Sequence, residues 1–176
     1  MIAALDENRL IGAGSGIPWQ LPRDSRHFRD YTEGKAMLLG RRTFEEMAGW
    51  FTTQRPLVMT RSADYAPAHL PAGFCAVGSV VAGIEQARAT GEAELVISGG
   101  AQIYAQGLPF AEELILTEIH AAFEGSEYFP EFRLAEWDQI VRESFEADAE
   151  NAHAMSFVTY RRRECATLGV GWDGLI

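Results

Sequence analysis

The stretch Leu95-Val96-Ile97-Ser98-Gly99-Gly100 runs from a short apolar strand into two adjacent glycines, and a helical stretch over residues 100–106 follows. A strand that turns directly into a helix is the unit from which parallel sheets are built. The glycine pair fits a tight turn that needs a positive φ. It also fits a helix N-terminus where a phosphate approaches bare backbone amides, although a glycine pair alone is a weak signal of such a site.

The same arrangement recurs on either side of this stretch. The strand predicted over residues 36–39 ends at Gly40, and a helix over 42–48 follows. Further strands are expected over residues 1–5, 56–60, 73–77, 113–120, 137–147 and 154–162, and further helices over 23–31 and 79–89. The last two strands can pair antiparallel. The pattern predicts an α/β fold with a mixed, mostly parallel sheet and helices on both faces.

Composition limits the classes of partner. The chain has 176 residues, which favours one domain, and its net charge of −10 argues against nucleic acid or an anionic membrane as a partner. Cys75 and Cys165 are too isolated to indicate a zinc site or a disulfide framework, so no metal is expected. No apolar run approaches the length of a membrane span, and no signal peptide is visible.

Three arginines follow the ends of predicted strands in this acidic chain. Arg41 and Arg42 come directly after Gly40, and Arg61 follows the strand over 56–60. Cations at a helix N-terminus oppose the helix dipole, so their placement favours a bound anion such as a phosphate dianion. The alternative interpretation is a set of solvated surface arginines.

The segment from Ile17 to Phe28 places one acid after two prolines. Pro18 and Pro22 bracket Trp19, and a helix is expected to begin at Pro22 or Arg23 because proline is tolerated at the first helical position. Asp24 and Phe28 then share one helical face. Asp24 either complements the helix dipole or is a carboxylate that holds a cationic or amidine-like ring against apolar walls.

This segment, together with Leu39–Phe44, Val96–Tyr104 and Leu116–Ile119, resembles the dihydrofolate reductase family, in its bacterial chromosomal type, in the right order over about residues 1–163. The resemblance implies an eight-stranded, mostly parallel mixed sheet with an antiparallel C-terminal strand. It implies a single domain over residues 1–163, and the C-terminal tail over residues 164–176 lies beyond the resemblance. A monomer in the cytoplasm is expected.

The resemblance also implies the reaction. It is the NADPH-dependent reduction of 7,8-dihydrofolate to 5,6,7,8-tetrahydrofolate by hydride transfer to C6 and protonation of N5 from water, a step of one-carbon metabolism and an antifolate target. Asp24 would accept hydrogen bonds from the pterin N3–H and 2-amino group. Thr117 would buttress Asp24 through a hydrogen bond. The catalytic residues implied are Asp24, Trp19 and Thr117.

Two further sets of residues are implied by the family. The substrate-binding residues are Ile2, Ala3, Ala4, Asp24, Phe28, Met47, Arg55, Ser98 and Tyr104, with Arg55 expected on the α-carboxylate of the folate tail. The cofactor-binding residues are Ala4, Ile11, Gly12, Gly40, Arg41, Arg42, Thr43, Thr60, Arg61, Ser62, Gly99, Gly100, Ala101, Gln102 and Ile103. Arg41, Arg42 and Arg61 would read the 2′-phosphate of NADPH. A cis bond between Gly99 and Gly100 is also implied.

The loop over residues 6–16 is either a flexible surface loop or an active-site lid, since it is rich in glycine. Two other functions remain open. One is an NADPH-dependent pyrimidine reductase of the riboflavin-pathway type, which is not expected to carry Trp19, Asp24 and Phe28. The other is a catalytically silent folate- or nucleotide-binding protein, which the intact Asp24 and Gly99-Gly100 make the weaker alternative.

Overall fold

The computed structural model describes residues 1–14, 16–62, 64–67 and 70–163. The expected tail over residues 164–176, which includes Cys165, lies outside the described residues.

The first sheet contains both the N-terminal strand and the last strand of the described residues. Its order is β1 (Ile2–Leu5), β7 (Glu113–Ile119), β10 (Met155–Arg162) and β9 (Trp137–Phe145). Strand β1 is parallel to β7, whereas β10 is antiparallel to both β7 and β9. The expected antiparallel C-terminal strand is therefore confirmed.

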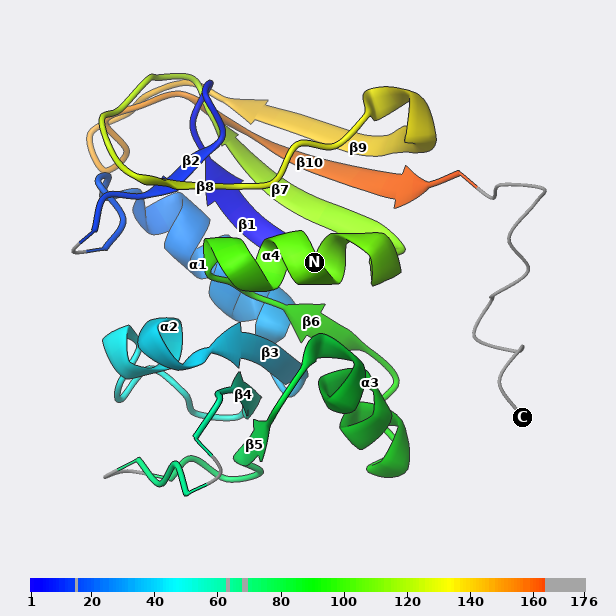
Figure 1. Ribbon diagram of the computed structural model, residues 1–176. Helices are drawn as coiled ribbons and strands as arrows, with labels where there is room; N and C mark the ends of the chain where they lie inside the picture. Colours follow the sequence, from blue (N-terminus) through cyan, green and yellow to red (C-terminus); the bar gives the residue numbers. More distant parts are fainter. Residues whose placement is uncertain (15, 63, 68–69, 164–176) are drawn as a thin grey trace.

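The second sheet is parallel throughout. Its order is β5 (Cys75–Val77), β4 (Arg55–Met59), β3 (Ala36–Gly40) and β6 (Leu95–Ile97). In Figure 1 this sheet lies below the first. The eight predicted strands are all present, but among the described residues they form two hydrogen-bonded groups of four rather than one continuous sheet.

In the part of the chain that the structure describes, four α-helices connect these strands and lie on both faces, with α1 behind and α4 in front in Figure 1. They are α1 (Pro22–Thr32), α2 (Arg41–Glu46), α3 (Val80–Ala89) and α4 (Ala101–Gly107), with 3-10 turns η1 (Leu108–Phe110) and η2 (Leu134–Glu136). Pro22 occupies the first turn of α1, as expected. The Ser79 side chain caps α3 by accepting from the Ala82 amide at 3.1 Å. Helices α2 and α4 begin directly after Gly40 and Gly100.

A small antiparallel pair was not predicted from the sequence. Strand β2 (Leu10–Gly12) pairs with β8 (Glu127–Tyr128). These strands are only three and two residues long, so they carry no alternation that would reveal them. A Cβ on Gly125 would lie 2.6 Å from the Gly12 carbonyl oxygen, so this neighbouring position has no room for a side chain.

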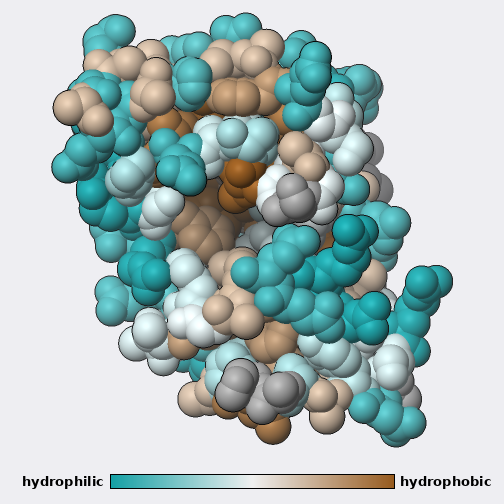
Figure 2. All heavy atoms as spheres, turned by 90° about the vertical axis from the view of Figure 1, so that its left-hand side faces the viewer, coloured by the Kyte–Doolittle hydropathy of each residue, from teal (hydrophilic) through white to brown (hydrophobic). Residues whose placement is uncertain are grey.

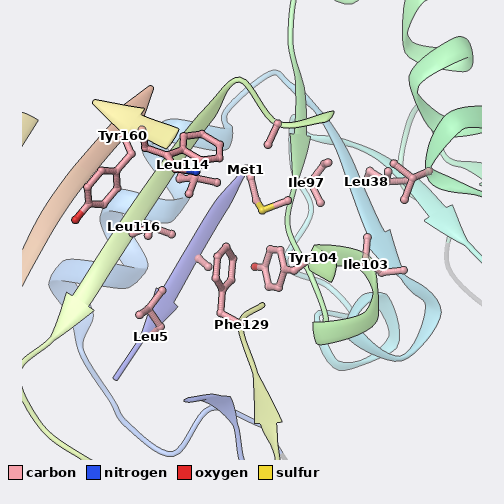
Figure 3. Packing of buried hydrophobic residues seen from close by; sticks show 14 of the residues in the cluster. Met1, Leu5, Leu38, Ile97, Ile103, Tyr104, Leu114, Leu116, Phe129 and Tyr160 are labelled. Carbon is pink, nitrogen blue, oxygen red and sulfur yellow. The ribbon is translucent and has the colours of Figure 1, made fainter. Parts of the chain in front are cut away.

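Buried side chains join the two sheets into one core. Figure 3 shows Leu38 and Ile97 from the second sheet in the same cluster as Leu114 and Leu116 from the first. Between them the Tyr104 hydroxyl donates to the Ile2 carbonyl oxygen at 2.7 Å. This packing brings the βα turns of the second sheet beside β1 and β7. None of the described helices is long and apolar enough to cross a membrane.

Candidate active site

A cleft of about 1280 Å³ lies where α1, α2, α4 and the carboxyl ends of β3, β4 and β6 meet β1 and β7. Figure 2 shows this face of the molecule hollowed, with hydrophobic side chains in its depth and hydrophilic ones around it. Ligands of open α/β sheets bind outside the carboxyl ends of the strands. The position of the cleft follows that rule.

Most of the residues predicted for the site line this cleft, and two do not. The predicted residues that line it are Ile2, Ala3, Ala4, Ile11, Gly12, Asp24, Phe28, Gly40, Arg41, Arg42, Thr43, Met47, Thr60, Arg61, Ser62, Ser98, Gly99, Gly100, Ala101, Gln102, Ile103, Tyr104 and Thr117. Trp19 and Arg55 lie elsewhere. The lining residues not predicted as site residues are Gly14, Gly16, Ile17, Ser25, Glu46, Trp50, Met59, Gly78, Gln106 and Glu127.

Asp24 is the acid of the apolar part of the cleft. It stands in the first turn of α1, and Phe28 follows one turn later on the same wall. Burial raises the pKa of the Asp24 carboxyl, and a hydrogen bond from Thr117 lowers it in part. Thr117 is only 2% exposed and lies beside Ala4 in the β1–β7 register. The carboxyl is therefore held against one strand by a buried hydroxyl.

Trp19 lies next to Asp24 without lining the main cleft. Its ring packs on Phe123 at 5.2 Å between centroids, and its Nε1 is buried without a hydrogen-bond partner among the described residues. Trp19, Asp24 and Ser25 line a second cavity of about 200 Å³. Trp19 therefore lines this second cavity together with Asp24 and does not line the main cleft.

The two glycine turns lie against one another at the other wall. The Gly99–Gly100 bond is cis, and Gly99 has a φ of +109°. The Gly40 amide donates to the Gly99 carbonyl oxygen at 2.8 Å. A Cβ on Gly100 would lie 3.3 Å from Thr43 Oγ1, and one on Gly40 would lie 3.2 Å from Ile103. Bare backbone therefore forms this surface of the cleft.

Arg41, Arg42 and Arg61 line the end of the cleft beyond these turns, and all three are exposed. Arg41 Nε lies 3.9 Å from Glu45 Oε1 and its guanidinium lies over the Tyr65 ring at 5.9 Å. In the described part of the chain, Arg42 and Arg61 have no ion pair. This cluster leaves positive charge available to an anionic ligand.

Arg55 corrects one prediction. It begins β4, at the opposite end from the cleft, and its guanidinium is held by Glu92, with Nε at 2.6 Å from Oε1. The hydrogen bond to Glu92 raises the pKa of Arg55. The Arg55 side chain therefore already forms an ion pair with a carboxylate of its own chain. The assignment to a substrate tail does not fit this geometry.

The residue before Arg55 is the one that points inward. Gln54 is 2% exposed, and its Oε1 accepts from the Thr52 and Thr53 amides at 3.1 and 3.3 Å. Its Nε2 is buried without a partner among the described residues. The segment before β4 has no alternation of apolar and polar residues, so the sequence gives no signal that separates Gln54 from Arg55.

The glycine-rich loop over residues 6–16 is anchored at its start. Asp6 Oδ1 accepts from the Asn8 and Leu10 amides, and Oδ2 accepts from the Phe123 amide, all at 2.8 Å. Gly12, Gly14 and Gly16 then line the cleft, and Gly14 and Gly16 have positive φ angles. The loop forms the rim of the cleft from a fixed base.

Residues 1–162 match the family model described as "Dihydrofolate reductase". The chain is 39% identical over 163 residues to dihydrofolate reductase type 3 of Salmonella typhimurium, covering 93% of this chain and 97% of that protein. It is 33% identical over 170 residues to the Bacillus subtilis dihydrofolate reductase, covering 96% of each. A structure of Enterococcus faecalis dihydrofolate reductase complexed with NADP(H) and RAB-propyl matches with a TM-score of 0.77 at 29% identity, over 93% of this chain and 95% of that one.

Proposed function

The chain belongs to the dihydrofolate reductase family, and on this premise we propose how its residues carry out the NADPH-dependent reduction of 7,8-dihydrofolate to 5,6,7,8-tetrahydrofolate. The enzyme is an oxidoreductase, its cofactor is NADPH, and the resemblance identified from the four motifs is confirmed. A riboflavin-pathway pyrimidine reductase is not favoured by these matches.

The residues of the glycine-turn wall fit a dinucleotide phosphate. The backbone at Gly99 and Gly100 lines the cleft without a side chain of its own, and a Cβ at Gly100 would fill the space beside Thr43. The Gly40 amide is already bonded to the Gly99 carbonyl oxygen, so Gly40 contributes close approach rather than a free donor. We assign Arg41, Arg42 and Arg61 to the 2′-phosphate because guanidinium groups bind phosphate through paired hydrogen bonds. When bound, NADPH supplies the hydride.

Asp24 is the central residue of the substrate half. Its carboxylate is suited to accept two hydrogen bonds from the pterin N3–H and 2-amino group. A negative charge in this water-poor position stabilises positive charge that develops on the ring as N5 takes a proton. The proton itself comes from water in this proposal, and the small cavity between Trp19 and Asp24 has the size to hold water.

The apolar walls orient the ring for reaction. Ile2, Ala3, Phe28 and Met47 line the cleft beside Asp24. Thr117 donates a hydrogen bond to the carboxyl, and Trp19 lines the small cavity next to it. Because the cofactor carries the redox chemistry, the contribution of these residues is positioning and electrostatics.

The observation that carries this assignment is that a half-buried carboxyl with a raised pKa and the paired glycine turns share one cleft. The test is the absorbance at 340 nm of NADPH mixed with the protein. NADPH should be consumed only when dihydrofolate is added. Consumption with a ribosylaminopyrimidine instead would support the riboflavin-pathway alternative, and binding without turnover would support a silent binding protein.

The organisation of the molecule in solution is also part of the proposal. We infer one domain over residues 1–163 that acts as a monomer, because one chain supplies both the wall with Asp24 and the wall with the paired glycine turns. The net charge of −10 disfavours nucleic acid as a partner. Cys75 forms no disulfide with any residue in the described part of the chain, which supports a reducing compartment such as the cytoplasm. Light scattering during gel filtration would detect a dimer and so contradict the monomer.

A further inference from the structure

Helix α1, which carries Asp24, has no cap of its own. Its N-cap residue is Leu21, which makes no side-chain capping hydrogen bond, and Pro22 has no N–H to donate. The first amide to bond within the helix is that of Ser25, which donates to the Leu21 carbonyl oxygen at 3.1 Å. The amides of Arg23 and Asp24 therefore need partners from outside the helix.

A residue far along the chain supplies one of these partners. Asn151 lies in the β9–β10 loop (residues 146–154), and its Oδ1 accepts from the Arg23 amide at 3.0 Å. The side-chain Nδ2 of Asn151 donates to Asp148 Oδ1 at 2.9 Å. Because each end of this amide has a matching partner, its orientation is fixed. Asn151 is 1% exposed, so water does not compete for these bonds.

Asp148 organises the loop around this contact. Its Oδ1 also accepts from the amides of Glu150 at 2.9 Å and Asn151 at 2.8 Å, and its Oδ2 accepts from Arg23 Nη2 at 2.7 Å. The bonds from Asn151 are the main reason that the pKa of Asp148 falls to about 2. The Arg23 guanidinium also lies over the Phe145 ring at 4.6 Å. The loop thus holds Arg23 by both its backbone and its side chain.

We propose that Asn151 is a positioning residue for the reduction: it caps α1 from the β9–β10 loop and so fixes where the carboxyl of Asp24 sits. Asn151 does not line the cleft, so it acts through the helix rather than on the substrate. Asp24 is the next residue after Arg23, in the turn that frays first when a helix lacks its cap. A reacting group must be held within about 0.5 Å of its productive position. This inference rests on the proposed function.

The test compares Asn151→Ala with Arg26→Ala. Arg26 contacts Glu150 in the same loop at 3.4 Å from an exposed position, so Arg26→Ala removes a loop–helix contact without touching the cap. We expect Asn151→Ala to lower kcat/KM for dihydrofolate about tenfold, by loss of positioning, and to leave the Kd of NADPH unchanged. Hydrogen exchange of the Arg23 amide should become faster in Asn151→Ala alone. Arg26→Ala should match the wild type in both measurements.

Asp148→Asn is the second variant, for the case in which Asn151→Ala does not fold. It removes the charge that binds the Arg23 side chain and keeps Asn151, so a fall in kcat/KM of about threefold is expected. A lower Tm with unchanged kcat/KM for dihydrofolate, in either variant, would reduce Asn151 to a structural role and overturn the proposal. A wild-type protein that does not oxidise NADPH with dihydrofolate would instead contradict the proposed function, and faster exchange at Arg23 would still report the cap.

Discussion

Strand β4 has an arginine near each end, and only one of the two is bound by a carboxylate of the described chain. At its amino end, Arg55 is bound by Glu92, and the neighbouring Lys35 is bound by Glu94 at 2.8 Å. At its carboxyl end, Arg61 reaches the cleft with no ion pair to a described residue. Only residues 56–60 separate a cation that stabilises the fold from one that is available to a ligand.

The difference follows from the direction of the strands. In a parallel sheet all carboxyl ends meet at one edge, so the loops that follow them gather around a ligand site. The amino ends meet at the opposite edge, where a charge has only its own chain to pair with. Arginine after a parallel strand therefore favours a binding role, and arginine at the start of one favours a structural ion pair.

The largest effect should come from Asp24, the acid of the apolar part of the cleft. Replacing Asp24 with Asn removes the charge and turns an acceptor into an NH₂ that faces a ring donor. Hydride transfer measured by stopped flow at pH 7 should fall about 10²–10⁴-fold, with NADPH affinity nearly unchanged. The loss should shrink as pH falls, because the substrate then takes its proton from solvent. Asp30→Asn, on the exposed side of the same helix, is the control, and equal activity in both variants would remove Asp24 from the mechanism.

The next effect tests the arginines at the carboxyl ends. The double variant Arg41→Gln/Arg61→Gln should lose most of its preference for NADPH over NADH. Charge-assisted hydrogen bonds contribute about 1.5–3 kcal/mol each, so the change in the ratio of the two kcat/KM values should exceed about tenfold. Arg163→Gln, which breaks an exposed pair with Asp138, serves as the control. Equal losses for both cofactors would show that these arginines do not read the 2′-phosphate.

A smaller effect concerns stability. The folded protein raises the pKa of Asp24 above its ordinary value of 3.8, so the folded state holds more protons than the unfolded state above that pH. The wild type therefore loses stability as pH rises through the folded pKa, whereas Asp24→Asn does not. At pH 7 the variant should have a higher Tm than the wild type, and the difference should vanish near pH 3. A variant less stable at pH 7 would contradict this.

The smallest effect belongs to the amino end of β4. Arg55→Ala should change the KM for dihydrofolate by less than about twofold and lower the Tm slightly, because a partly exposed ion pair contributes about 0–1 kcal/mol. Glu92→Ala should give the same Tm loss, and the double variant should lose no more than either single one. A marked rise in the KM for dihydrofolate in Arg55→Ala would instead show that this arginine contacts the substrate.

The βα turns were predictable because glycine marks them. Gly40 and Gly99-Gly100 each end an apolar strand, and the structure has the turns there. Asp24 could be placed because Pro22 fixes where its helix begins. These features depend on local backbone geometry, which short stretches of sequence encode.

The features that the sequence did not predict depend on contacts between residues that are distant in the chain. No feature of the sequence near Arg55 indicates that it pairs with Glu92. Asn151 is a polar residue in a loop, and its role as a cap is visible only once the fold places it beside Arg23. Trp19 was expected among the catalytic residues, and the sequence does not reveal that it lines a separate cavity beside Asp24 instead of the main cleft. Such contacts are set by the packing of whole elements.

The position of β10 has a consequence for the newly made chain. This strand lies between β7 and β9, and the loop that precedes it caps the helix of Asp24. On the ribosome, 128 residues separate the synthesis of Arg23 from that of Asn151, an interval of about 6–25 seconds at typical elongation rates. Until residue 151 has been added, the first turn of this helix lacks the loop residue that caps it. A ribosome-bound chain that stops before residue 151 therefore has an unfinished active-site helix.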